Sequence, residues 1–102
     1  MNSKHYQSER NRREKIIQNC IHGDGDVIDS FIVDKGHKDG VEIHNITNTG
    51  LIIIYNKESG KLITKLIARP AQINRYYSEL NRKPPQWLLD LAHWHYRMGY
   101  NR

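Results

Sequence analysis

The sequence predicts an α+β fold with an N-terminal helix, a four-stranded antiparallel meander sheet and two C-terminal helices. Apolar residues recur with helical spacing near both ends of the chain. Between them lie four short runs rich in isoleucine, separated by turns that contain glycine. Those turns are too short for a crossover, so each strand must pair antiparallel with the next, in the order 1-2-3-4. At 102 residues we expect a single domain, 1–102.

The predicted first helix spans residues 4–21. Its apolar residues fall in the second half, where Ile16, Ile17 and Ile21 share a face with Cys20. The first half is almost wholly polar, and we expect residues 1–12 to form a flexible basic arm. Cys20 is the single cysteine, which excludes an internal disulfide and a multi-thiolate zinc site, and its apolar context predicts a buried thiol.

The predicted strands differ in their patterns. The second alternates cleanly between two faces, whereas the third is apolar on both faces, which is typical of a central strand. We expect helices to cover one face of the sheet and the other face to remain open to water. The four predicted strands are Val27–Asp34, Val41–Thr47, Leu51–Tyr55 and Lys61–Ala68.

The last strand ends at Arg69, because Pro70 presets the first turn of a helix. A second break at "NRKPP" precedes the final helix, whose stripe of Trp87, Leu88 and Leu91 predicts core residues. For three aromatic residues of this helix we favour roles in the core or as caps and keep base stacking as the alternative; they are Trp87, Trp94 and Tyr96.

The distribution of charge favours a polyanionic partner. The formal net charge is +5, and residues 57–83 alone carry seven cations against two carboxylates. A basic block of this kind favours nucleic acid, with RNA preferred here. The N-terminal residues lack the apolar region of a signal peptide, and no apolar run is long enough to span a bilayer. We therefore expect a cytoplasmic protein without a membrane partner.

The fourth strand presents cations on one side. Simple alternation places Lys61, Lys65 and Arg69 on a common face, opposite Thr64. Arginine at the end of such a ladder can hold a phosphate with two hydrogen bonds. Arg75 and Tyr77 on the following helix extend this predicted nucleic-acid surface, with one tyrosine of the Tyr76-Tyr77 pair facing the groove.

The histidines suggest phosphodiester cleavage without a cofactor. A ribonuclease needs a base for the ribose 2′-hydroxyl, an acid for the leaving oxygen and cations for the pentavalent phosphate. His44 and His37 supply the first two, and the lysines and Arg69 supply the third. The motif "HWH" (residues 93–95) is a poor metal site, because i and i+2 diverge by roughly 200° on a helix. We expect no metal.

The order of elements and the late histidine, threonine and arginine residues over positions 5–80 resemble the barnase/EndoU/colicin/RelE group of small ribonucleases. The segments "DKGHKDGVEIHNITNTGLIIIYN" and "KLITKLIARPAQINRYY" are also similar to small proteins of phages and mobile elements of Gram-positive bacteria, which include toxin-like and anti-CRISPR proteins. The resemblance implies a catalytic set of His44, Thr64, Arg69 and either Tyr76 or Tyr77.

Two functions follow as expectations. The first is a metal-independent endoribonuclease that uses His and Lys/Arg on an open sheet face. The alternative is a non-catalytic, phage-encoded inhibitor that binds a host nucleic-acid-handling protein or its nucleic acid. A DNA-binding regulator is a weaker third possibility, because the Pro-Pro segment between the last helices does not suit a helix-turn-helix turn.

Overall fold

The predicted order of elements is confirmed. The computed structural model describes residues 3–36 and 40–102. The fold is α+β. The first two strands have the predicted bounds, whereas the first helix and the last two strands begin or end one or two residues away from the predicted positions. The elements are α1 (Ser3–Asn19), β1 (Val27–Asp34), β2 (Val41–Thr47), β3 (Leu51–Asn56), β4 (Leu62–Ile67), α2 (Pro70–Glu79) and α3 (Gln86–Arg97).

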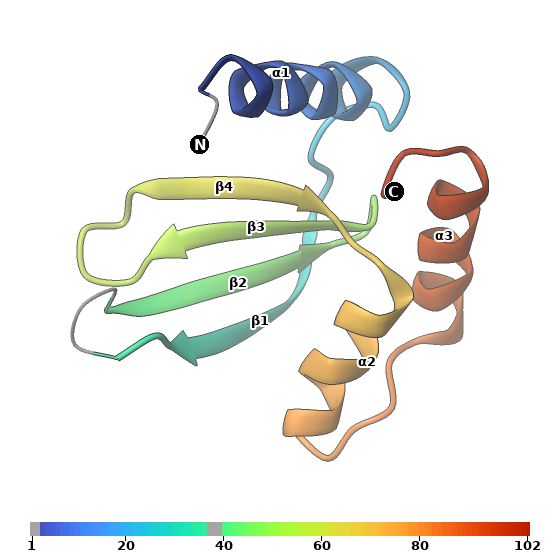
Figure 1. Ribbon diagram of the computed structural model, residues 1–102. Coiled ribbons are helices and arrows are strands. Elements are labelled where there is room, and N and C mark those ends of the chain that lie inside the picture. The colour runs from blue at the N-terminus through green and yellow to red at the C-terminus, as the bar shows by residue number, and fades with distance from the viewer. Residues whose placement is uncertain (1–2, 37–39) are drawn as a thin grey trace.

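The four strands form one antiparallel sheet in the order β1-β2-β3-β4, which confirms the predicted meander (Figure 1). Gly50 turns the chain between β2 and β3 at φ +84°, a conformation that favours glycine. The pairing of β3 with β4 is irregular, because Ile54 pairs with Thr64 and Tyr55 with Leu62. Ile63 is therefore an extra residue, and it changes which side chains of β4 share a face.

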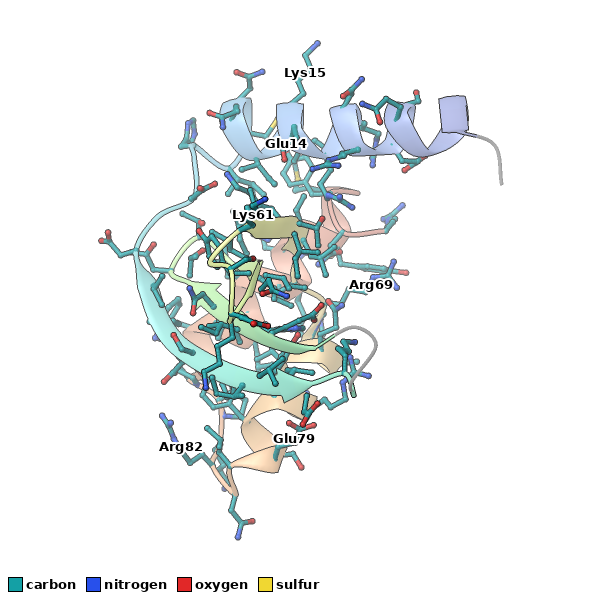
Figure 2. The ribbon with its side chains drawn as sticks, turned by 90° about the vertical axis from the view of Figure 1, so that its left-hand side faces the viewer. Glu14, Lys15, Lys61, Arg69, Glu79 and Arg82 are labelled. Carbon is teal, nitrogen blue, oxygen red and sulfur yellow. The ribbon has the colours of Figure 1, made fainter. Side chains whose placement is uncertain are left out.

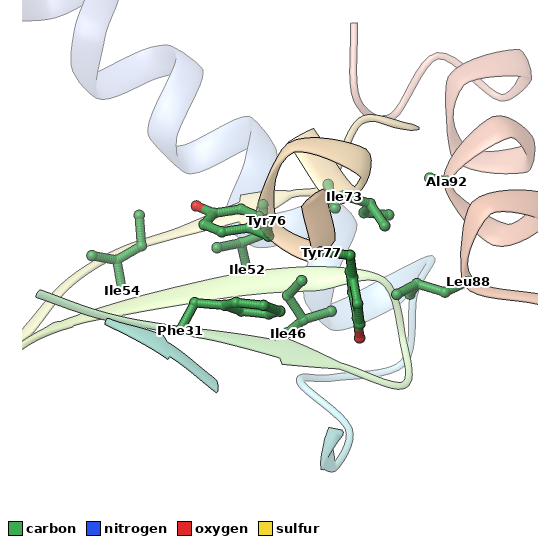
Figure 3. Packing of buried hydrophobic residues seen from close by; sticks show 10 residues of the cluster. Phe31, Ile46, Ile52, Ile54, Ile73, Tyr76, Tyr77, Leu88 and Ala92 are labelled. Carbon is green, nitrogen blue, oxygen red and sulfur yellow. The ribbon is translucent and has the colours of Figure 1, made fainter. Parts of the chain in front are cut away.

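Helices cover both faces of the sheet, so the expectation of one open face is wrong over half of the sheet. The larger core lies under α2 and α3 and includes Phe31, Ile52, Tyr77 and Leu88 (Figure 3). A second cluster joins α1 to β3 and β4 on the other face. Figure 2 shows the sheet between α1 above and α2 below. Water reaches that second face over β1, where Ile32 is 58% exposed.

Two expectations about single side chains are wrong. Cys20 is exposed, whereas Ile17 of α1 and Ile21 after it are buried in the second cluster, with Ile16 packed against them. Trp87 is 49% exposed, whereas Leu88 next to it is fully buried. The docked face of α3 is therefore rotated away from Trp87.

The fold is small and compact, with a radius of gyration of 13.9 Å. Within residues 3–36 and 40–102, none of the helices combines the length and the apolar character needed to cross a bilayer.

Candidate anion-binding site

Four arginines meet at a cavity of about 320 Å³ between α1, the end of β4, the start of α2 and the segment after α3. We call it the arginine cavity. Glu9, Gln72 and Tyr100 also line it. The arginines come from three distant parts of the sequence and are Arg12, Arg13, Arg69 and Arg102.

Neutral oxygen atoms hold each of these guanidinium groups in place. Arg12 Nη2 donates a hydrogen bond to the Gly99 carbonyl oxygen (3.1 Å), and Arg13 Nη2 donates to Thr64 Oγ1 (3.2 Å). Arg69 Nε and Arg102 Nε donate to the carbonyl oxygens of Asn101 (2.9 Å) and Tyr96 (3.0 Å). These bonds fix the guanidinium groups without neutralising them.

Positive charge predominates in the cavity. The ion pairs among the described side chains are His44–Glu42, Lys65–Asp24 and Arg82–Asp29, so none involves an arginine of the cavity. The formal charge of the lining is +3, from four arginines and Glu9. In addition, Arg13 Nε is buried and has no hydrogen-bond partner within the described part of the chain. Such a site suits an anion with several oxygen atoms.

The N-terminus of α2 faces this cavity and adds to its preference for anions. Arg69, the residue before the helix, is extended (φ −95°, ψ 151°), as Pro70 after it predicts. The Arg69 backbone N–H donates to Gln72 Oε1 at 2.8 Å. Buried Asn101 donates to the carbonyl oxygens of Ala68 and Ala92, which ties the end of the chain to β4 and α3. The arginine cavity is thus built on fixed backbone, and the helix dipole favours negative charge there.

The predicted ladder of Lys61, Lys65 and Arg69 is not formed. Lys61 precedes β4, and the extra residue Ile63 breaks the alternation of side chains between Lys61 and Lys65. Lys65 forms an ion pair with Asp24 (2.8 Å), and the hydrogen bond to this carboxylate raises the pKa of Lys65. Lys61 precedes β4 and Arg69 follows it, so the two residues lie at opposite ends of this strand. Figure 2 shows Arg69 between α1 above and α2 below. Of the three, only Arg69 reaches the cavity.

The predicted catalytic residues His44 and Tyr76 do meet, but under α2 instead of on an open face. His44 is 5% exposed, and its Nδ1 lies 2.5 Å from Tyr76 Oη while Nε2 lies 2.8 Å from Glu42 Oε1. An ionised Glu42 can only accept, so it accepts a hydrogen bond from His44 Nε2, while His44 Nδ1 and the Tyr76 hydroxyl share the second hydrogen bond. Burial raises the pKa of the Tyr76 phenol. Both ring nitrogens of His44 are therefore engaged within the core.

The other predicted residues have separate outcomes. Thr64 accepts a hydrogen bond from Arg13, which lines the arginine cavity. Tyr77 is fully buried and donates to Asp29, so its predicted role in base stacking is wrong. Tyr76 is also buried, so neither tyrosine faces a groove. Arg75 is exposed on α2. His37 lies outside the described residues.

Sequence reasoning missed Arg12, Arg13, Arg102 and Tyr100. The basic run "RNRREK" (residues 10–15) was a signal, but its polar character suggested an arm and not one wall of a cavity. Neither a protein-family model, nor a curated protein sequence, nor a solved structure matches this chain. Conclusions about function must therefore come from the geometry.

Proposed function

We propose that the protein is a small nucleic-acid-binding protein, with RNA as the favoured ligand, and that the arginine cavity holds a backbone phosphate. The observation that carries this proposal is the convergence of four arginines, none of which forms an ion pair among the described side chains. Each guanidinium uses one N–H donor for a neutral oxygen of the described residues, and planar guanidinium groups match the geometry of phosphate oxygens. Exposed Lys61 and Arg75 add to a basic surface that can meet further phosphates.

Binding of a short RNA at several salt concentrations tests this proposal. The association constant should fall steeply with salt, because phosphate contacts release counterions. Arg69→Gln should weaken binding by about tenfold or more, as expected for loss of a charged hydrogen bond. Arg69→Lys keeps the charge but not the fork, so partial recovery would separate a specific contact from the general field.

Lys57→Gln is the matched control. Lys57 is exposed in the β3–β4 hairpin and does not line the cavity, so its loss should have a small effect. Equal losses in the Lys57 and Arg69 variants, or binding that is independent of salt, would contradict a phosphate site. The same experiment with DNA of matching sequence measures the preference for RNA.

Metal-independent endoribonuclease activity is a second candidate, and Glu9 favours it. Its carboxylate lines the same cavity as the four arginines, so it can accept the proton of a ribose 2′-hydroxyl. The 2′-oxygen then attacks phosphorus, the 5′-oxygen leaves with a proton from the Tyr100 phenol, which lines the same cavity, and the arginines stabilise the charged phosphate. Interaction with Cys20 raises the pKa of Tyr100, which keeps this neighbouring phenol protonated.

RNA incubated with the protein in EDTA tests for cleavage. Glu9→Gln should lower the rate by about 10²-fold or more, the range for loss of a general base. RNA that is bound but not cleaved by the wild-type protein excludes the ribonuclease. That result favours a non-catalytic protein that occupies nucleic acid or competes for it, such as an inhibitor.

A further inference from the structure

A second cavity of about 320 Å³ has a lining that is linked to the arginine cavity through the ring of Tyr100. Tyr100 lines the arginine cavity, and its ring packs against Trp94 and His95 at centroid distances of 5.9 and 6.1 Å. Trp94 and His95 line the second cavity. Cys20 also lines the second cavity and interacts with Tyr100. One aromatic cluster thus connects the two cavities.

The walls of the second cavity are aromatic, apolar and neutral polar. Trp94 is 41% exposed, which leaves part of its indole ring free to stack on a ligand. Asn48 and Thr49 contribute polar side chains, and among the described residues no lysine, arginine, aspartate or glutamate lines this cavity. A cavity of this size and chemistry suits a neutral planar ring with hydrogen-bonding edges.

His95 is the buried part of this wall. The residue is 2% exposed, and its Nδ1, which has no hydrogen-bond partner within the described ranges, is closed to solvent. The ring lies against Gly50, where a Cβ atom would come within 2.8 Å of His95 Cε1. His95 therefore shapes the wall by packing, and burial lowers its pKa.

We propose that the second cavity holds a nucleobase of a single-stranded nucleic acid whose phosphate occupies the arginine cavity. The base stacks on Trp94 and directs its polar edge toward Asn48. This inference rests on the proposed function and defines its substrate further: bases of a duplex are already paired and stacked, so only an unpaired base can enter.

Binding of an eight-nucleotide oligouridine, followed by fluorescence anisotropy, tests the base site. Trp94→Ala should weaken binding by about 5- to 150-fold, the range for loss of one stacked base. Trp87→Ala is the control, because Trp87 is equally exposed on the same helix but lines neither cavity. The Trp87→Ala protein should bind the oligouridine with the affinity of the wild-type protein. A fully base-paired RNA duplex of the same length should bind more weakly than the oligouridine.

Cys20 gives a second measurement that needs no substitution. It is exposed and is the single cysteine, so the rate of its reaction with a maleimide reports on the second cavity. The oligouridine should slow this reaction, whereas an abasic oligonucleotide of the same charge should not. If RNA binds with unchanged Cys20 reactivity, or if both tryptophan variants bind equally well, the base site is overturned and the phosphate site stands. Absence of any RNA binding overturns the proposed function itself.

Discussion

Arg69 shows how far a single residue could be predicted. Its extended backbone and its place between β4 and α2 follow from Pro70, and the structure confirms both. Its partners could not be predicted, because they come from the other end of the chain. The Arg69 guanidinium donates to the Asn101 carbonyl oxygen and forms no ion pair among the described side chains.

The chain of Glu42, His44 and Tyr76 is expected to stabilise the core and to take no part in any cleavage. His44→Ala leaves the Tyr76 hydroxyl and the Glu42 carboxylate without their partner, which should lower the free energy of unfolding by about 2–4 kcal/mol. Urea unfolding measures this loss. Tyr76→Phe removes one hydrogen bond and should have a smaller effect.

RNA binding and cleavage by the same His44→Ala protein provide the other half of this test. Both should be near the wild-type level per folded molecule, because His44 is buried and does not line the arginine cavity. A variant with normal stability and lost cleavage would return His44 to the catalytic role that its residue type first suggested.

At the scale of elements, strands were easier to predict than helix faces. Alternation and glycine turns fix a strand within its own few residues, so β1 and β2 have the predicted bounds. The apolar stripe of α3 is broader than its contact with the sheet. Leu88, Ala92 and His95 are buried within an arc of about 60° at 100° per residue, whereas Trp87 lies outside this arc. The pattern alone could not tell which edge of the stripe would dock.

Alanine substitution of Trp87 and of Leu88 tests which face of α3 packs on the core. Leu88→Ala should lower the free energy of unfolding by about 2–5 kcal/mol, because Leu88 is fully buried in the core. Trp87→Ala should lower it by less than about 1 kcal/mol, since half of its surface is already in water. Thermal unfolding measures the free energy of unfolding of both variants. A larger decrease for Trp87→Ala than for Leu88→Ala would mean that α3 docks through its other edge.

At the scale of the whole molecule, the candidate site could not be predicted, because the fold brings together residues that lie far apart in the sequence. Residues 12 and 102 lie at opposite ends of the sequence, yet both line the arginine cavity. The sequence indicated a basic protein and one arginine of the site, whereas the fold supplies the other three. The acidic residues of positions 24–34 do not neutralise them, because the ion pairs of Asp24 and Asp29 are made with Lys65 and Arg82 instead.

This arrangement predicts that anions stabilise the whole fold. Four like charges around one cavity repel each other, and a bound phosphate both relieves this repulsion and favours the folded state by mass action. Inorganic phosphate at 100 times its dissociation constant should add about 2.7 kcal/mol to the free energy of unfolding. For a domain of this size, that amounts to a rise in melting temperature of roughly 10 °C or more.

Thermal unfolding in phosphate and in chloride at equal ionic strength separates binding at the cavity from general screening. The wild-type protein should gain more from phosphate than from chloride, and the gain should saturate with phosphate concentration. Arg13→Gln combined with Arg69→Gln removes two of the four charges, so this variant should lose most of the difference between the two salts. The Lys57→Gln protein should keep it, because Lys57 lies in the distant β3–β4 hairpin. Equal stabilisation of the wild-type protein by both salts would show that the arginine cavity does not bind phosphate, whatever RNA the rest of the surface attracts.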